Sequence, residues 1–200
     1  MRLTVGCHKG GVGKTTTSVL LALQLAQDRP TVLIDGDRQG SASTWARMAG
    51  DDWPDRLTVV PWRDPLSLPP AELSHVIIDT GPGDPVRLRA ALAVSDTAVI
   101  PIGSRRGDVV QLRETVETVE KAAADRPLAW GVLLTMVRLS TKASRQAPSA
   151  ITAVDYPLLT TVIPQSAAIA DAFGTAPNRF YAYADLLREI TEEDTDHGAP

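Results

Sequence analysis

Short apolar runs alternate with longer amphipathic segments along almost the whole chain. In the amphipathic segments apolar residues recur every three or four positions, the spacing of one helix face, whereas the short runs have the length of buried strands. This alternation predicts βαβ units and an α/β fold with a mainly parallel, twisted sheet flanked by helices. The expected strands are residues 3–6, 31–35, 57–61, 76–79, 97–102, 130–136 and 158–163. The expected helices are residues 14–26, 41–48 (capped by Ser41), 85–94, 109–124, 167–173 and 181–193.

Composition limits further which class of protein this chain can be. The 200 residues are 44% hydrophobic and 22% charged, the balance of one globular domain. We expect that domain over residues 1–194 and a disordered acidic tail over residues 195–200. No apolar run reaches the length of a membrane span or a secretion signal. The single cysteine, Cys7, permits no internal disulfide and fits a reducing cytoplasm.

Charge is distributed unevenly along the chain. The net charge of −4 argues against a protein that coats nucleic acid through bulk charge. Residues 126–154 nevertheless contain no acidic residue, whereas residues 185–200 are rich in Asp and Glu. We therefore expect a polarised surface. The cations of the acid-free segment are Arg126, Arg138, Lys142 and Arg145.

A glycine-rich stretch between the first expected strand and the first expected helix carries the strongest chemical signal. Glycines let backbone N–H groups turn inward on phosphate oxygens, and the helix that follows directs its positive end at the same charge. Lys14 is expected to reach the β- and γ-phosphates of a nucleotide, and the Thr15 hydroxyl to bind Mg²⁺. The expected phosphate-binding residues are Gly10, Gly11, Val12, Gly13, Lys14, Thr15 and Thr16, with Lys9 just before them.

Two further groups of carboxylates follow expected strands. The Asp35-Gly36-Asp37 stretch ends the expected strand at residues 31–35, and Asp79 ends the expected strand at residues 76–79. The carboxyl ends of parallel strands line the ligand crevice of such sheets. We expect Asp79 to orient Mg²⁺ through water, and either Asp35 or Asp37 to hold an attacking water. Taken alone, an aspartate in this position is often only a cap for the next helix.

These motifs together resemble the ParA/MinD family of deviant Walker A ATPases. Residues 9–16 look like the family's first box, with its extra lysine before the paired glycines. Residues 32–41 are similar to its second box, and residues 75–82 resemble its Walker B strand. The resemblance implies a single P-loop ATPase domain that binds ATP and Mg²⁺. Further matching stretches are residues 98–102, 135–137 and 162–164.

The resemblance implies a role for each matching residue. Lys14 and Thr15 become ligands of the phosphates and of Mg²⁺, and Lys9 becomes the signature lysine that reaches the partner's ATP across a dimer. Asp37 matches the water-activating acid, which also lies at the metal site, and Asp79 matches the Walker B acid. Lys9, Lys14 and Asp37 are thus the implied catalytic residues.

A segment near the end of the chain matches with less specificity. Pro164 and Gln165 correspond to residues that border the adenine in relatives. Three positions depart from the usual pattern. His8 stands in place of a first glycine, Arg38 in place of a common proline, and Gly81 in place of another. These departures remove no expected ligand.

Within the family the chain is most like the small plasmid-type ParA proteins, because its nucleotide loop begins at residue 9. Such proteins act in plasmid or chromosome partition. The resemblance implies a homodimer with ATP that binds DNA without sequence preference on the nucleoid. It also implies a centromere-binding ParB-like adaptor that stimulates hydrolysis. Arg138, Lys142 and Arg145 are the candidate phosphate contacts for DNA.

Other functions are weighed against this one. A membrane-positioning ATPase of MinD type needs a basic amphipathic C-terminal helix, whereas residues 181–193 carry Arg188 against four acids. An iron–sulfur reductase needs paired cysteines, and a GTPase is expected to show an N-K-x-D motif, which Asn178 does not supply. A ParA-like ATPase that positions another cargo, and a small-molecule kinase or ligase of the same superfamily, stay open.

Overall fold

A computed structural model describes residues 1–196 except 65, 67, 71, 73, 106, 109, 110 and 139, with the side chains of 193–196 left aside. Its centre is a seven-stranded sheet in the order β3-β2-β4-β1-β5-β6-β7, with every neighbouring pair parallel. All seven predicted strands are present, within two residues of their expected bounds. The strands are β1 Arg2–Val5, β2 Thr31–Gly36, β3 Leu57–Pro61, β4 His75–Thr80, β5 Thr97–Gly103, β6 Ala129–Val137 and β7 Leu158–Pro164.

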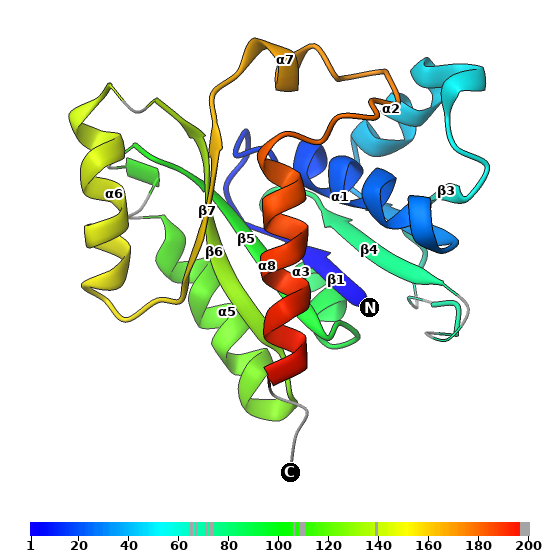
Figure 1. Cartoon of the computed structure of the whole chain (residues 1–200). Helices are drawn as coiled ribbons and strands as arrows, with labels where there is room; N and C mark the ends of the chain where they lie inside the picture. The colour runs from blue at the N-terminus through cyan, green and yellow to red at the C-terminus, as the bar shows by residue number, and fades with distance from the viewer. Residues whose placement is uncertain are drawn as a thin grey trace.

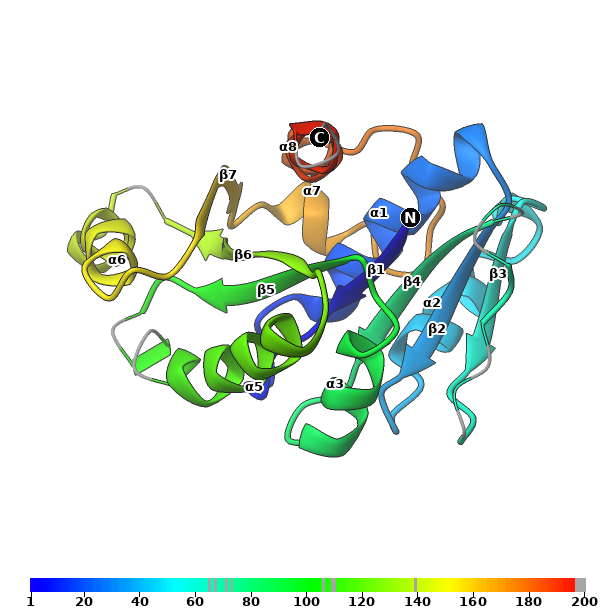
Figure 2. The ribbon, with the colours of Figure 1, turned by 90° about the horizontal axis from the view of Figure 1, so that it is seen from below.

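Helices cover both faces of this sheet (Figure 1). Seen from below, α3 and α5 lie on one face and α1 and α8 on the other, while α6 lies at the β7 edge (Figure 2). The predicted α/β architecture is therefore confirmed. The helices are α1 Lys14–Asp28, α2 Ser41–Ala49, α3 Pro85–Leu92, α5 Leu112–Asp125, α6 Lys142–Thr152, α7 Ala167–Ala170 and α8 Ala182–Asp196, with a 3-10 turn at Gly50–Asp52.

The alternation of side chains along the strands builds apolar cores on both faces of the sheet. Leu3 and Val99 pack with residues of α1 and α8, whereas Ala98 and Ile100 pack with residues of α3 and α5. Both sets are fully buried. Strands covered on both faces read as continuous apolar runs, which explains why the sequence pattern located them well.

Helix α6 was not predicted. Its sequence is rich in Ser, Thr and Ala, contains Pro148, and buries only Ser144, Ala147 and Ile151. Thr141 caps it by accepting a hydrogen bond from the Ser144 N–H at 3.2 Å. With so few apolar positions on one face, the helical period is hard to recognise from the sequence.

The predicted cap of α2 is wrong. Gly40, in the left-handed conformation, occupies the N-cap position, and Ser41 is the first helical residue. A carboxylate takes over the capping role: Asp35 Oδ2 accepts hydrogen bonds from the Ser43 N–H at 2.8 Å and the Ser43 hydroxyl at 2.6 Å. The sequence contained the donor and the acceptor, but eight residues separate them.

Two predicted elements reach beyond the described residues. The start of the helix expected at 109–124 falls on residues 109 and 110, which lie outside them, and α5 begins at Leu112. Helix α8 runs to Asp196, two residues into the expected tail, and residues 197–200 also lie outside the description. Within the described part of the chain, every helix is too short or too polar to cross a membrane.

Candidate functional site

The carboxyl ends of the central strands bring the predicted site residues together. In the sheet register Val5 of β1 lies opposite Asp79 of β4, and Asp79 lies opposite Asp35 of β2. The glycine-rich loop leaves β1 at this same edge and leads into α1. Strand pairing thus brings Asp79 to the start of α1, where the Thr15 hydroxyl, 64 residues away in sequence, contacts it.

The loop from Gly10 to Gly13 turns the chain into α1. Gly13 is the N-cap of α1 with φ 81°, a left-handed conformation that side chains beyond glycine adopt at a cost. Val12 is buried, and its carbonyl accepts a hydrogen bond from the Thr135 hydroxyl at 2.9 Å. Among the described residues no side-chain hydrogen bond caps α1, so its first N–H groups keep their capacity to bind an anion.

Lys14 lies at the first position of α1 and is only 6% exposed. Its ammonium donates a hydrogen bond to the Lys9 carbonyl at 2.6 Å, so the side chain folds back over the loop. Burial lowers the pKa of Lys14 below its usual value, and the nearby Cys7, Asp79 and Asp37 counteract this effect. A buried cation over a glycine loop is an arrangement that favours a polyanion such as a phosphate.

Asp79 is fully buried beside the start of α1. Its Oδ2 accepts from the Thr15 hydroxyl at 2.7 Å, and its Oδ1 accepts from the Ser18 hydroxyl at 3.1 Å. Burial raises the pKa of Asp79 to about 7, although both hydroxyl groups stabilise the charged form. A divalent cation held by Thr15 would stabilise the carboxylate in the same place, so the pair fits the predicted metal role.

Asp35 and Asp37 lie in different surroundings. Asp35 is 3% exposed and its Oδ2 is used by Ser43, while its Oδ1 is buried without a hydrogen-bond partner among the described residues. Asp37 is partly exposed, accepts from the Gln39 N–H at 2.9 Å and lines a cavity of about 320 Å³. The cavity lies between the segments after β2 and β4, where a small molecule such as water could enter.

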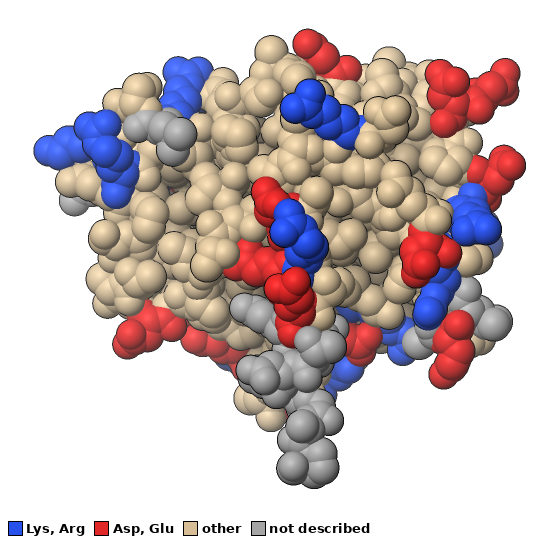
Figure 3. All heavy atoms as spheres, in the orientation of Figure 1, with Lys and Arg blue, Asp and Glu red and all other residues tan. Residues whose placement is uncertain are grey.

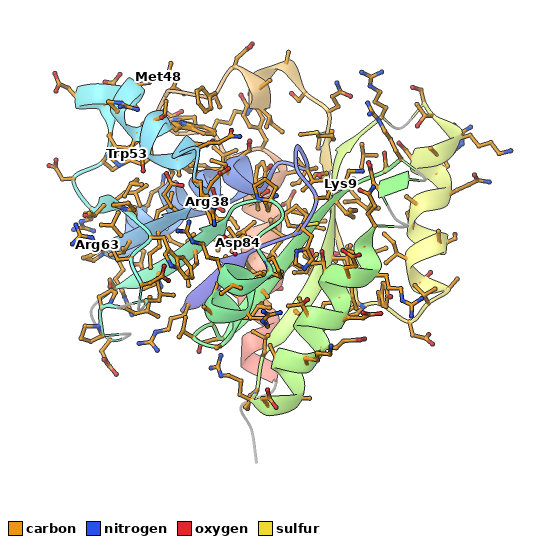
Figure 4. All side chains as sticks on the ribbon, turned by 180° about the vertical axis from the view of Figure 1, so that it is seen from behind. Lys9, Arg38, Met48, Trp53, Arg63 and Asp84 are labelled. Atoms are coloured by element: carbon orange, nitrogen blue, oxygen red, sulfur yellow. The ribbon has the colours of Figure 1, made fainter. Side chains whose placement is uncertain are left out.

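Two arginines near this cavity were not predicted as site residues. Arg38, whose side chain is 84% exposed, approaches Asp84 at 3.6 Å, and both are labelled in Figure 4. Arg87 donates to the Gly36 carbonyl at 2.9 Å and lies over the Trp62 ring, 5.6 Å from its centre. The segment after β2 is thus tied to α3, and the departure at Arg38 adds an ion pair without removing a ligand.

Lys9 lies at the opposite side of the loop from Arg38 (Figure 4). Its ammonium forms an ion pair with Asp108, which follows β5. The sequence gave no signal for this contact, because 99 residues separate the two side chains. Lys9, which the resemblance implies reaches a partner's ATP, is therefore engaged within its own chain.

The ends of β6 and β7 approach the loop from the other direction. The Gln165 N–H donates to the Val137 carbonyl at 3.0 Å, which fixes Pro164 and Gln165 beside the end of β6. Met136 has φ 52° and is 47% exposed, and its methyl group lies next to Gly13. The predicted adenine-border residues therefore share the sheet edge with the phosphate loop.

The three candidate DNA contacts do not form one compact cluster. Lys142 and Arg145 lie on α6 and, with Arg113 of α5, line a cavity of about 1130 Å³. Arg138 precedes α6, and its guanidinium instead donates to Gln165. Lys and Arg side chains gather over the α6 edge in Figure 3, whereas acidic groups dominate over α8. The expected polarisation is visible on this face.

Known proteins match this chain over most of its length. Residues 3–176 match the CobQ/CobB/MinD/ParA nucleotide binding domain. The maintenance of carboxysome distribution protein A of Gloeobacter kilaueensis is 36% identical over 139 residues, which span 64% of this chain and 60% of that protein. The chain thus spans less than two thirds of that relative.

Solved structures share the fold at lower identity. A plasmid partition protein of Borrelia burgdorferi B31 bound to AMPPNP superposes with a TM-score of 0.77 at 18% identity, covering 96% of this chain and 98% of its own. Cobyrinic acid a,c-diamide synthase of Mycobacterium smegmatis, with bound ATP analog and magnesium, gives 0.72 at 19%, covering 96% and 95%. The resemblance indicated by the motifs is confirmed. By the match over residues 3–176, the chain belongs to the CobQ/CobB/MinD/ParA nucleotide binding domain family.

Proposed function

We propose that this protein is a Mg²⁺-dependent ATPase of ParA type, which acts in plasmid or chromosome partition as an ATP-dependent dimer on DNA. The observation that carries the proposal is the buried group formed by Lys14, Thr15 and Asp79 at the start of α1. A buried cation, a hydroxyl and a carboxylate in this order suit a nucleotide triphosphate and its metal ion.

Nucleotide capture rests on the loop and on Lys14. The ammonium of Lys14 leaves the Lys9 carbonyl and turns to the β- and γ-phosphates, while backbone N–H groups of the loop bind the same oxygens. Mg²⁺ supplies neutralisation of the phosphate charge when bound. Thr15 is the residue that would hold it, and Asp79 would orient its water ligands.

Asp37 is the better candidate for orienting the attacking water. Its carboxylate lines the cavity between the segments after β2 and β4, and only one backbone N–H engages it among the described residues. Asp35 already caps α2 through Ser43, and moving it would remove that cap. We therefore assign positioning of the water to Asp37.

Dimerisation and DNA binding extend the proposal beyond one chain. Lys9 is proposed to reach the partner subunit's ATP, and Arg138, Lys142 and Arg145 to contact DNA phosphates without reading bases. A ParB-like adaptor is proposed to stimulate hydrolysis and so release the dimer. In this scheme the protein works in the cytoplasm on the nucleoid.

A second candidate function is the positioning of a cargo other than DNA. The specific observation in its favour is the 36% identity to a protein named for carboxysome distribution. The same site and the same ATP cycle serve both functions, so the two differ only in the adaptor. Deleting the gene for this protein and following plasmid retention and the spacing of intracellular particles would distinguish them, because loss of plasmids supports partition and clustered particles support the second function.

The proposed nucleotide site is tested by titrating the purified protein with a fluorescent ATP analogue. Lys14→Ala should weaken ATP binding by roughly 100-fold or more, since each hydrogen bond to a charged group contributes about 1.5–3 kcal/mol. Lys121→Ala, on the exposed face of α5, is the matched control and should bind normally. Unchanged affinity of Lys14→Ala would contradict the assignment.

A further inference from the structure

Arg87 joins three parts of the molecule beside the carboxylate that we assign to the attacking water. Its guanidinium, on the first turn of α3, donates to the Gly36 carbonyl at the end of β2 at 2.9 Å. The same guanidinium lies over the ring of Trp62, just after β3, 5.6 Å from the ring centre. The side chain is only 22% exposed, so solvent screens these contacts less than it would on the open surface.

A carboxylate fixes the direction of this guanidinium. Asp84 Oδ2 lies 3.8 Å from Arg87 Nε, and Asp84 Oδ1 accepts from the Arg87 N–H at 3.1 Å, which caps α3. Arg38 and Asp84, both labelled in Figure 4, mark where the segments after β2 and β4 meet. A guanidinium held by a carboxylate and an aromatic ring loses little further freedom when it binds a carbonyl. The hydrogen bond to Gly36 is thus preorganised.

The carbonyl that Arg87 binds belongs to the peptide unit that leads into Asp37. Because the peptide bond is planar, the orientation of this carbonyl sets the direction in which Asp37 begins. The surrounding backbone is close: a Cβ on Gly36 would come within 2.5 Å of the Asp79 carbonyl, and one on Gly81 within 3.2 Å of the Asp37 Cα. The segments after β2 and β4 therefore meet backbone to backbone, and a shift of the Gly36 carbonyl would move Asp37.

We propose that Arg87 is a positioning residue for ATP hydrolysis, which holds the Gly36 carbonyl and so keeps the Asp37 carboxylate in place to orient the attacking water. The proposal rests on the proposed function, in which Asp37 orients that water. Arg87 acts through the backbone and needs no contact with the nucleotide. A misplacement of about 1 Å in a catalytic group can slow a reaction roughly 100-fold, so losing this hold should slow the chemical step and leave ATP binding unchanged.

The first experiment measures whether Arg87 orders the turn at Asp37, and it needs no ATP. Two amides report on this turn: the Gln39 N–H donates to Asp37 Oδ1 at 2.9 Å, and the Gly40 N–H donates to the Asp37 carbonyl at 3.0 Å. Arg87→Met keeps a long apolar stem over Trp62 but loses every donor. By NMR, the two amides of the nucleotide-free variant should exchange with solvent about 3- to 10-fold faster, the scale of one hydrogen bond.

Matched variants separate this effect from a general loosening of the fold. Arg89→Met removes an exposed arginine from the same helix and should leave both amides unchanged. Arg87→Lys keeps one donor on a stem of similar length, so it should restore most of the protection. Should Arg87→Met fail to fold, Asp84→Asn tests the same hold. Its amide still caps α3, and the lost charge should speed exchange of the two amides about 2- to 3-fold.

The second experiment measures steady-state ATP hydrolysis. Arg87→Met should lower kcat about 10-fold with the KM for ATP unchanged, which is the pattern of a group that acts on the chemical step alone. Arg87→Lys should stay within about 3-fold of the wild type, and Arg89→Met should equal it. In the Asp37→Ala background Arg87→Met should have no further effect, because the carboxylate that it places is already gone.

The two experiments fail in different ways. Unchanged exchange of the two amides, faster exchange with an unchanged kcat, or an equal loss of kcat with and without Asp37 would overturn the proposal. An Asp37→Ala protein that hydrolyses ATP normally contradicts the proposed function instead, and the exchange rates then still decide whether Arg87 holds the turn at Asp37.

Discussion

The edge of the sheet that carries the predicted nucleotide site, here called the nucleotide edge, lies at the carboxyl ends of β1, β2 and β4. It differs from the edge beside α6 in how its charged side chains are buried and paired. At the nucleotide edge Lys14, Asp35 and Asp79 are buried, and each has a hydrogen-bond partner. At the α6 edge Lys142 and Arg145 are exposed, and a large cavity separates α6 from α5. A buried polar group is costly without its partner, so the first region tolerates little change, whereas the second can vary. We expect substitutions in the two regions to differ accordingly.

The largest effect is expected for Asp37→Ala. Losing the group that orients water slows the chemical step more than binding, so hydrolysis should fall roughly 100-fold or more with ATP affinity nearly unchanged. The protein should then accumulate as an ATP-bound dimer. Single-turnover hydrolysis with size-exclusion chromatography measures both.

Asp35→Ala is the matched comparison on the neighbouring carboxylate. It should keep hydrolysis within a few-fold of wild type but lose about 1 kcal/mol of unfolding free energy, because the cap of α2 disappears. Normal hydrolysis by Asp37→Ala together with an inactive Asp35→Ala would reverse the two assignments.

The pH dependence of stability tests the burial of Asp79 in the nucleotide-free protein. Because its pKa is raised to about 7, the folded protein binds this proton more tightly than the unfolded chain does. The contribution of this proton to the free energy of unfolding is fully present below the pKa of the unfolded chain, near 4. It is lost as the pH rises towards 7. Between pH 5 and 7 the difference of one bound proton lowers the free energy of unfolding by about 2–3 kcal/mol at most. Denaturant titrations at several pH values with EDTA measure it.

Asp79→Asn should remove this pH dependence, since the amide has the same shape and no charge. The variant should exceed the wild type in stability at pH 8 and differ little from it near pH 4. A wild-type curve that is flat between pH 5 and 7 would mean that Asp79 stays charged in the fold.

Smaller effects are expected at the α6 edge. We expect each charge reversal, at Arg138, Lys142 or Arg145, to reduce the steepness of the salt dependence of DNA binding. The magnitude of the slope of log K for DNA binding against log salt concentration should fall by about 0.9, while ATP affinity stays unchanged. Because Arg138 bonds Gln165 rather than lining the α6 cavity, its reversal also tests whether it belongs to the same surface. Three reversals without a change of slope would leave α6 without a role in DNA binding.

The smallest effect is expected for Arg38→Ala. Its ion pair with Asp84 is largely exposed, and such pairs contribute about 0–1 kcal/mol. Stability and ATP affinity should both stay close to wild type. A large loss of hydrolysis in this variant would instead give Arg38 a direct role beside Asp37.

The sequence predicted the sheet and the nucleotide loop because both depend on local patterns. Continuous apolar runs located the strands, and the glycine loop has its own signature between β1 and α1. Two features were not predicted from the sequence, for physical reasons. Helix α6 has too few apolar residues for a clear period and contains Pro148, and the Lys9–Asp108 pair joins residues 99 positions apart. The sequence left open whether Asp35 or Asp37 orients the attacking water. We chose Asp37 only because the Ser43 N–H already donates a hydrogen bond to Asp35.

The central place of β1 has a consequence for synthesis of the protein. β1 is made first, yet its neighbours are β4 and β5, with Leu3 opposite both Ile77 and Thr97. Contacts so distant in sequence form slowly, because the intervening chain must first be brought together. We therefore expect the loop that follows β1 to stay unformed on the ribosome until β5 has emerged. An interrupted chain that stops before residue 97 would carry the complete nucleotide motif without its scaffold.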